Sequence, residues 1–521
     1  MLYDLLIVVL YFTVVFIIAL RGRQGANASI EEYFLSSRNL RWHSIAISTI
    51  ATNVQGYQFL GMMGSAYLYG LAQANLEINA MQGILMAAFI FVPLYLKEKV
   101  ITITQFIKTR LGKTVALCYS VANLALLSTV GLGAALFWGA YAADMVFGDY
   151  LDFISPDRIT RIAVLIVGLG LFSAIYTYFG GLAAVVKTDI IQFAILTAGG
   201  IIITVVSLSK AGGFSALYEK APDLMHLHLP ADHPQLPWIA IVGMFLLNIN
   251  YWCANQSVIQ RSLAARSLKE AQVGLMVGGV MKYFMAILII IPGIALAVIL
   301  DGKPLPDPDQ TFPYLVSNFL PLGLRGIILC ALFASLMSTV DSLFNSLATL
   351  WSIDIYKPYI NKTATDQQVV RTGRSTIIFT LITGIVMGYV LLYVKFENPE
   401  AAFTHTLNNL RYFINCGIVV VICISAFLLM PNQRLVLASF LVTIPLHLII
   451  LAVSDKLGYE INYFVRAMWV ILIAFALTAI PHSFSKKWYP VKAVFASSSS
   501  RVKQIGWGLL GSLALLHILF H

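Results

Sequence analysis

Four ionisable side chains lie in stretches of the chain that are otherwise apolar. Glu77 occurs in NLEINA and Asp189 in KTDIIQ, while Lys282 (GVMKYF) and Asp341 (STVDSLFNS) lie deeper within their apolar runs. An ionisable residue inside a membrane costs at least a few kcal/mol and is usually paired or functional. For Glu77 and Asp189, a helix cap at the membrane interface is the plainer alternative. We predict that these side chains contribute to a polar site within a membrane.

The hydrophobic stretch 48–67, STIATNVQGYQFLGMMGSAY, has a polar interruption in its middle. The interruption consists of Asn53, Gln55, Gly56, Tyr57 and Gln58. An unpaired amide in hydrocarbon costs several kcal/mol, so these groups should face protein or a water-filled cavity. A helix that opens at Gln55–Gly56 would expose backbone carbonyls, as the discontinuous helices of secondary transporters do. The alternative is a continuous helix whose amides bind a neighbouring helix.

A second interrupted stretch is MFLLNINYWCANQ at 244–256. The predicted span to which it belongs comes five spans after the first interrupted one. It contains several amide side chains: Asn248, Asn250, Asn255 and Gln256. Two interrupted spans at matching positions of two five-helix halves are the best pointer in a sequence to a binding site near the middle of the membrane. The pattern therefore predicts an inverted repeat with a site between its halves.

The polar residues of these stretches indicate the kind of solute that would bind. They offer amide donors and acceptors and one charge of each sign: Gln58, Glu77, Asn248, Asn250 and Lys282. That mixture suits a neutral molecule with several hydroxyl groups, because hydroxyls both donate and accept hydrogen bonds. Three aromatic residues nearby would stack on the apolar face of a sugar ring: Tyr57, Tyr251 and Trp252. An anionic solute would instead require an excess of Arg or Lys.

A separate set of small hydroxyl residues falls in the segment ASLMSTVDS. Ser335, Ser338, Thr339 and Ser342 are spaced by three and four residues, which places several of them on one helix face. Hydroxyl and carbonyl oxygens are hard ligands that suit an alkali cation better than a transition metal. Close packing of small residues between helices is the alternative explanation.

The composition establishes the class of protein that must position these residues. Hydrophobic residues make up 59% of the chain and charged residues 11%, compared with about 25% charged residues in soluble domains. The 521 residues leave room for about fourteen spans of roughly 20 residues each. We therefore predict an all-α integral membrane protein. Its spans are expected near 3–21, 43–67, 74–96, 114–147, 159–179, 186–209, 237–256, 271–300, 321–352, 373–394, 403–430, 434–453, 462–481 and 504–520.

The distribution of charge predicts the orientation of the chain. The net charge is +10, and most of the 34 Lys and Arg residues fall in loops on one side of the predicted spans, among them 97–113 and 257–270. By the positive-inside rule these loops are cytoplasmic, so both termini are predicted to lie outside. The basic residues are thus explained by a lipid bilayer as the partner, and not by nucleic acid. We expect a multi-pass protein of the plasma membrane or bacterial inner membrane.

Four ordered segments resemble the solute:sodium symporter family, most closely its bacterial sodium/galactose and animal sodium/glucose branch. They are EEYFLSSRNLRWHSIAISTIATN, YTYFGGLAAVVKTDIIQ, NYWCANQSVIQRSLAARSLKEAQ and STVDSLFNSLATLWSIDIYKPY. The resemblance covers roughly 30–360 strongly and 360–430 weakly, and the last three spans mainly in hydropathy. It implies a LeuT-like fold with five plus five helices in inverted repeat, one helix before them and three after. The expected divisions are 1–42, 43–209, 210–430 and 431–521.

The resemblance also implies roles for individual residues. Its sugar contacts fall on Gln58, Glu77, Asn248 and Lys282, its inner and outer gates on Tyr251 and Met62, and Asn408 stands where galactose transporters have Gln. Its sodium site falls on Ala51, Val54, Ser335, Ser338 and Thr339. Asp189 matches an acidic residue on the route by which the ion leaves. In relatives that bind a second sodium, the residue at this position contributes to that second site together with the residues that match Asp341 and Ser342. Leu76 and Ala80 depart from the family pattern near the outer gate and the sugar.

These implications lead to the expectation of a sodium-coupled importer of a hexose such as galactose or glucose, with Na⁺ as the coupling ion. Arg411 leaves open a solute with a carboxylate, and a polyol, monocarboxylate, sialic acid or nucleoside are the alternatives within the family. A membrane-embedded solute sensor or a channel is a more distant alternative. We do not expect an enzyme, because the sequence presents no nucleophile–base pair or cluster of metal ligands.

Overall fold

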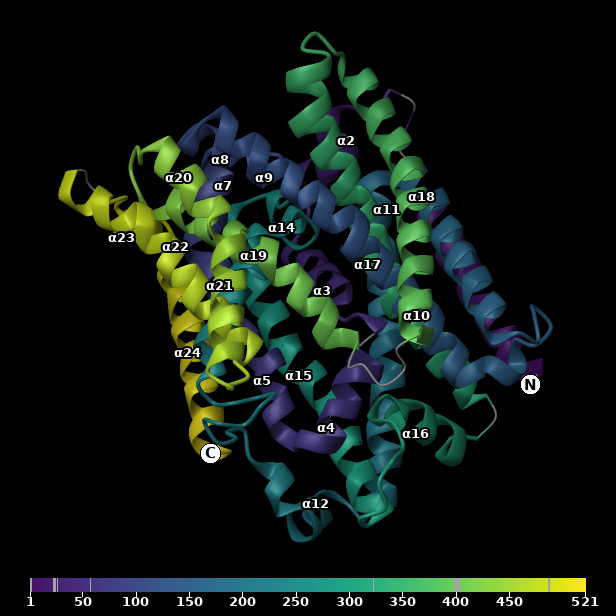
Figure 1. The fold of residues 1–521 in the computed structure, drawn as a ribbon. Coiled ribbons are helices and arrows are strands. Elements are labelled where there is room, and N and C mark those ends of the chain that lie inside the picture. The colour runs from purple at the N-terminus through teal and green to yellow at the C-terminus, as the bar shows by residue number, and fades with distance from the viewer. Residues whose placement is uncertain are drawn as a thin grey trace.

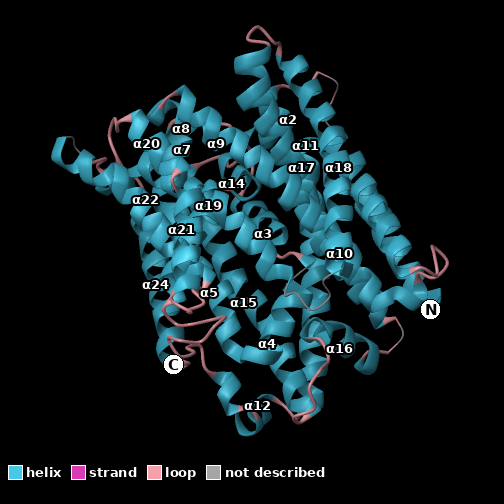
Figure 2. Ribbon diagram, in the orientation of Figure 1, coloured by secondary structure: helices cyan, strands magenta, loops and turns pink. Residues whose placement is uncertain are grey.

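The computed structural model describes residues 2–21, 25, 27–56, 58–321, 323–397, 403–485 and 488–521, and the regular elements of these residues are helices (Figures 1 and 2). The helices of the first half of the chain are α1 (Leu2–Arg21), α2 (Ile30–Leu35), α3 (Trp42–Asn53), α4 (Met63–Tyr69), α5 (Asn75–Ile78), α6 (Ala80–Met86), α7 (Val92–Lys97), α8 (Ile103–Leu111), α9 (Lys113–Leu126), α10 (Leu132–Phe147) and α11 (Arg158–Ala211).

The chain from Phe214 onward continues the all-helical pattern. Its helices are α12 (Phe214–Lys220), α13 (Ala240–Ile249), α14 (Gln256–Leu263), α15 (Leu268–Leu300), α16 (Thr311–Phe319), α17 (Leu324–Thr349), α18 (Asp366–Glu397), α19 (Phe403–Phe427), α20 (Gln433–Leu441), α21 (Thr443–Lys456), α22 (Tyr463–Ser485), α23 (Val491–Ala496) and α24 (Ser500–Leu519). Short π-helical segments extend several of these helices, at Gln58–Met62, Ala87–Phe91, Leu127–Gly131, Asn250–Ala254 and Leu350–Ile360.

Eleven helical stretches of the described residues are long and apolar enough to cross a membrane. Their burial differs widely: 94% of the most apolar window of the stretch that contains α17 is buried, compared with 22% for α1 and 17% for α24. The helix α17 therefore lies at the centre of the bundle, whereas α1 and α24 lie at its periphery. The predicted number of fourteen spans stays a prediction.

Two of the predicted spans, 159–179 and 186–209, are joined in the single long helix α11. Gly181 breaks the helical conformation between them, with φ 54° and ψ −149°. A Cβ at this glycine would lie 2.4 Å from the backbone oxygen of Tyr33, which belongs to α2. Only glycine satisfies both the positive φ and the close approach, so this residue lets the two halves of α11 change direction over α2.

The first predicted interruption is present in the structure. Helix α3 ends at Asn53, Val54 is extended, and Gln55 is not helical before the chain continues through the π-helical segment Gln58–Met62 into α4. Tyr57 lies outside the described residues. Because the chain leaves the helix here, carbonyl groups near Val54 lack the backbone N–H group four residues later that donates to a carbonyl in a continuous helix. These carbonyls are therefore available to other ligands.

The second predicted interruption has the same character. Helix α13 continues through the π-helical segment Asn250–Ala254 and stops at Asn255, which is extended (φ −81°, ψ 113°). The Asn255 side chain accepts a hydrogen bond from the backbone nitrogen of Ser257, 3.0 Å away, and so caps α14. Both predicted interruptions are therefore present among the described residues, and their place in two matching repeats stays a prediction.

Both ends of the chain lie at the same end of the bundle as α12 and α16, and α8, α20 and α23 lie at the opposite end (Figure 1). Asp4 accepts hydrogen bonds from the backbone nitrogens of Gly323 and Gly326, each 2.8 Å away, and so ties the start of the chain to the start of α17. The backbone oxygen of Phe520 accepts one from Leu227 at 2.7 Å. The start of the chain therefore contacts the start of α17, and its end contacts the loop that contains Leu227.

Candidate functional site

A cavity of about 930 Å³ lies beside the two broken spans. It is lined by the π-helical segment Gln58–Met62, α5, α13 and α15, and also by α19 and α22. Residues from two loops that the sequence assigns to the outer side form part of the lining, Gln235 with Leu236 and the segment 306–309. Several predicted site residues line this cavity: Gln58, Met62, Glu77, Asn248, Tyr251 and Lys282.

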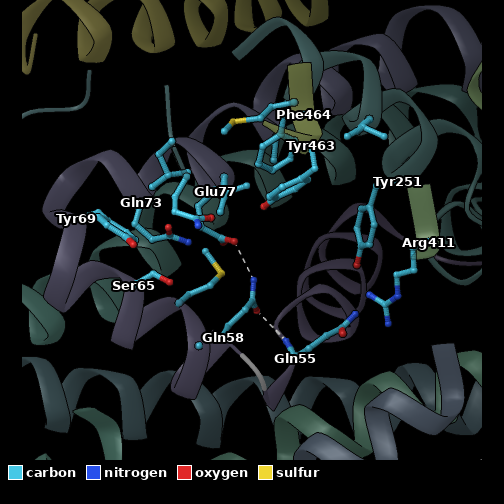
Figure 3. Close-up of a pocket in the computed structure, with 18 of the residues that line it drawn as sticks. Gln55, Gln58, Ser65, Tyr69, Gln73, Glu77, Tyr251, Arg411, Tyr463 and Phe464 are labelled. Atoms are coloured by element: carbon cyan, nitrogen blue, oxygen red, sulfur yellow. Dashed lines mark hydrogen bonds between the residues drawn. The ribbon is translucent and has the colours of Figure 1, made fainter. Parts of the chain in front are cut away.

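Three of these residues form a buried polar network. The side-chain amide of Gln58 donates to Glu77 Oε1 at 2.8 Å, and Lys282 Nζ donates to Glu77 Oε2. The backbone nitrogen of Gln55, at the break, donates to Gln58 Oε1 at 2.8 Å (Figure 3). The side chains of Lys282 and Glu77 are only 3% and 4% exposed. The charges of Glu77 and Lys282 compensate each other, so the network presents hydrogen-bonding groups to the cavity without a net charge.

Close packing of α6 against α13 places Asn248 beside this network. A Cβ at Gly83 would lie 2.8 Å from both the backbone oxygen of Asn248 and Cδ1 of Trp252, so a side chain at this position would push the helices apart. Leu76 and Ala80, where the sequence departs from the family pattern, also line the cavity. Asn408 lies in α19, but its side chain is outside the described residues.

The predicted sodium ligands gather where α17 crosses the first break. Ser335 Oγ donates to the backbone oxygen of Val54 at 2.7 Å, and Thr339 Oγ1 donates to the backbone oxygen of Thr52 at 3.2 Å. Ala51 is buried one helical turn before the break. The arrangement provides hydroxyl and carbonyl oxygens from two separate helices, and such oxygens are the kind of ligand that a hard alkali cation prefers.

Ser338, the remaining predicted ligand, connects this region to Asp189. Its hydroxyl donates to Asp189 Oδ1 at 2.5 Å, and Ser48 donates to the other carboxylate oxygen. Both Asp189 and Ser338 are fully buried. The carboxylate of Asp189 therefore contacts a predicted sodium ligand directly, and its place on an exit route for the ion stays a prediction.

Arg261 is a residue of this region that the sequence analysis misplaced. The charge pattern predicts that it lies in a basic cytoplasmic loop, 257–270, whereas in the structure it lies in α14 with no exposed surface. Its guanidinium contacts Asp189 at 3.4 Å and donates to hydroxyl groups of three neighbours. Those neighbours are Ser48, Thr52 and Ser342. A buried arginine requires such partners, and Asp189 supplies the opposite charge.

The three residues predicted for a second sodium therefore have different surroundings. Asp189 and Ser342 both contact Arg261. Asp341 instead accepts a hydrogen bond from the Tyr176 hydroxyl of α11 at Oδ2, and its Oδ1 has no hydrogen-bond partner among the described residues. The guanidinium of Arg261 thus lies among the side-chain oxygens of Asp189 and Ser342 that a second cation would use as ligands.

The cavity also has walls that the sequence analysis did not predict. They include two acidic residues of the loop before α16, a basic residue from the end of α18 and aromatic residues from α19 and α22: Asp307, Asp309, Lys395, Tyr412, Tyr463 and Phe464. Asp309 lies outside the membrane-spanning segments, and burial together with Asp307 raises its pKa to about 6, although Lys395 opposes this shift. The loop 301–320 is rich in Pro and Asp, and this composition is the signal in the sequence for the acidic part of the wall.

A model of the sodium:solute symporter family matches residues 33–442 of the chain. The sodium/glucose cotransporter of Vibrio parahaemolyticus is 29% identical over 553 aligned residues, which cover 99% of this chain and 98% of the relative. Sodium/glucose cotransporter 4 of Mus musculus is 30% identical over 420 residues, covering 74% of this chain and 60% of that longer protein.

Solved structures agree with these matches in fold. A sodium-coupled sialic acid symporter, in a substrate-bound outward-open state, superimposes with a TM-score of 0.77 at 17% identity, covering 94% of this chain and 99% of that one. The nucleobase-cation symporter Mhp1 in a closed conformation gives a TM-score of 0.53 at 14% identity, covering 93% and 99%. At these identities the likeness concerns the fold, and it confirms the predicted LeuT-like architecture.

Proposed function

The chain belongs to the sodium:solute symporter family, and from this premise we propose that it imports a hexose, such as galactose or glucose, together with sodium. Membership makes it a multi-pass membrane protein and a transporter, not an enzyme, with sodium as the coupling ion. The identity of the solute and the roles of single residues are the parts that we propose.

The observation that carries the hexose proposal is the compensated network of Gln58, Glu77 and Lys282 in the wall of the cavity. Because the carboxylate and the ammonium neutralise each other, a charged group of a solute that bound either of them would break the ion pair and leave a buried charge uncompensated. A neutral solute with several hydroxyls can add hydrogen bonds to the same groups. Relatives named sodium/glucose cotransporters support the same class of solute.

In the proposed cycle, sodium binds to carbonyl and hydroxyl oxygens at the first break, and the solute then binds in the cavity. The sodium ligands are Ala51, Val54, Ser335, Ser338 and Thr339, and the solute ligands are Gln58, Glu77, Asn248 and Lys282, with Asn408 as a further contact. Met62 and Tyr251 would close the cavity from outside and inside. Asp189 would guide the ion as it leaves, and Asp341 with Ser342 would serve a second sodium if one is coupled.

The proposal includes the organisation of the chain around this cycle. We assign 43–209 and 210–430 to the two repeats, 1–42 to the helix and loop that precede them, and 431–521 to the helices that follow. Both termini would lie outside the cell, because the basic loops lie at the opposite end of the bundle.

A second candidate is a solute with a carboxylate, since Arg411 and Lys395 also line the cavity. Arginine recognises carboxylates with two parallel hydrogen bonds. Figure 3 shows Arg411 near Tyr251, on the side of the cavity away from Glu77. An acidic sugar would thus reach both the hydroxyl-binding network and this basic side chain.

Uptake of labelled galactose and glucose into proteoliposomes, with and without an inward sodium gradient, tests the proposal. Unlabelled myo-inositol, sialic acid and lactate serve as competitors in the same experiment. Sodium-driven hexose uptake that Lys282→Ala and Gln58→Ala abolish is the expected result. Sodium-driven flux that an acid inhibits but hexoses do not would favour the second candidate and refute the first.

A further inference from the structure

Three aromatic rings form one wall of the cavity. Tyr412 comes from α19, and Tyr463 with Phe464 forms the first turn of α22. The ring centres of Tyr412 and Tyr463 are 5.7 Å apart at an interplanar angle of 31°, and those of Tyr412 and Phe464 are 6.0 Å apart at 43°. The rings are thus tilted only moderately with respect to one another and form a continuous apolar surface. Figure 3 shows Tyr463 and Phe464 together at the cavity, with Glu77 nearby.

The backbone of α22 is held firmly against the second broken span. A Cβ at Gly243 of α13 would lie 2.1 Å from the backbone oxygen of Phe464, so the two helices touch through their main chains. Asn462 precedes α22 and donates from its side-chain nitrogen to the backbone oxygens of Pro234 and Gln235, each 3.0 Å away. The aromatic pair is therefore placed by the same helix that carries Asn248.

We propose that Tyr412 and Tyr463, backed by Phe464, form a stacking surface for the ring of the solute, and that α22 therefore contributes to the choice of solute. This inference rests on the proposed import of a hexose. A pyranose has an apolar face of C–H groups and a periphery of hydroxyls. The aromatic wall matches the face, and the network of Gln58, Glu77 and Lys282 matches the hydroxyls.

The exposure of the three side chains fits contact with a solute. Phe464 is buried, only 3% exposed, whereas Tyr412 and Tyr463 keep part of their surface accessible. Phe464 thus supports the wall, and the tyrosines present rings with a polar hydroxyl at the edge, an amphipathic combination that suits a carbohydrate. Because α22 lies in the segment 431–521, outside the proposed repeats, part of the specificity would be set by a helix that follows the repeats, together with Tyr412 of α19.

The experiment compares a cyclic solute with its open-chain counterpart. The KM for galactose and the inhibition constant of galactitol are measured in proteoliposomes for the unmodified protein, Tyr463→Leu and Tyr412→Leu. Leucine keeps apolar bulk but removes the ring. Trp469→Leu is the matched control, because Trp469 lies on α22 with half of its surface exposed, 50%, and does not line the cavity. Tyr463→Phe restores the ring without the hydroxyl.

The proposal predicts that each tyrosine-to-leucine variant raises the KM for galactose by about threefold to tenfold and leaves galactitol binding nearly unchanged. Tyr463→Phe should restore the KM to within about twofold, and Trp469→Leu should match the unmodified protein. Equal losses for galactose and galactitol, or a normal KM in both leucine variants, would overturn the stacking surface while hexose import stands. Absence of sodium-driven galactose uptake by the unmodified protein would overturn the proposed function itself, and this inference with it.

Discussion

Replacing Lys282 with Met would remove the positive partner of a carboxylate that has almost no access to water. Glu77 would keep the 2.8 Å hydrogen bond from Gln58 but would lose its charge partner. Removing one member of a buried ion pair costs about 3–5 kcal/mol of folding free energy, because the remaining charge is left uncompensated. A second change, Glu77→Gln, removes that charge and keeps an oxygen that accepts the bond from Gln58. The double variant should therefore regain most of the lost stability.

The assay is a double-mutant cycle on purified protein in lipid nanodiscs, with unfolding followed by tryptophan fluorescence. The cycle compares the unmodified protein, Lys282→Met, Glu77→Gln and the double variant. We expect a coupling free energy of at least about 2 kcal/mol between the two sites. All three variants should lose hexose uptake, so the double variant would be stable but inactive. A double variant no more stable than Lys282→Met alone would refute the compensated ion pair as the basis of the site.

Three further predictions concern other parts of the structure. The double variant Ser338→Ala, Thr339→Ala should raise the sodium concentration for half-maximal uptake about tenfold or more, and should weaken hexose binding by linkage. Uptake with an unchanged sodium dependence would refute the assignment of these two residues as sodium ligands. Gly64→Ala should lower the Tm and the uptake rate, because the added Cβ would lie 2.4 Å from the backbone oxygen of Pro308. Such overpacking costs about 1–3 kcal/mol. The control is Gly508→Ala, because an added Cβ at Gly508 would meet no atom within 4 Å. Asp309 should make the stability of the protein depend on pH. Its pKa is raised from 3.8 to about 6 in the folded protein, so the folded state binds the proton more tightly than the unfolded state does. The resulting contribution to the free energy of unfolding is present below about pH 4 and is lost as the pH rises through 6. Asp309→Asn should abolish that trend in Tm measurements between pH 4 and 7, and an unchanged trend would contradict it.

The two breaks in the helices were predictable from the sequence, and so was the need of the polar residues for partners inside the protein. Amide and ionisable side chains in an apolar run can be accommodated in a membrane in only a few ways, and each of these ways requires a partner inside the protein. Gln58, Glu77 and Lys282 satisfy this requirement by contacting one another. The physical cost of leaving any one of them in lipid is what made the pattern informative.

The inner contacts of Arg261 were not predictable in the same way. The residue follows a polar segment, and a charge count by loops treats every arginine between two spans as exposed. In the structure the segment is the short buried helix α14, and Arg261 points to Asp189 and to hydroxyls of α3 and α17. The charge pattern reports which side of the membrane a residue lies on, but not how deeply the residue is buried.

The aromatic wall was hidden for a different reason. Tyr463 and Phe464 come from a helix whose sequence resembles the family mainly in hydropathy, and an aromatic residue near the end of an apolar span usually marks the membrane interface. Only the packing of α22 on α13, through Gly243, turns these two rings towards the cavity. A contact between residues more than two hundred positions apart leaves no trace in local sequence patterns.

The geometry of the first break explains how one ion would favour one solute in the proposed cycle. Val54, whose backbone oxygen accepts from Ser335, and Gln58, which donates to Glu77, are separated by a single turn of chain. The backbone nitrogen of Gln55 holds the side chain of Gln58 at 2.8 Å. An ion that fixes the carbonyl of Val54 would therefore also fix the direction of Gln58. By linkage, a solute that binds Gln58 must stabilise the ion to the same extent, so the first break itself would connect the sodium ligands to the solute ligands.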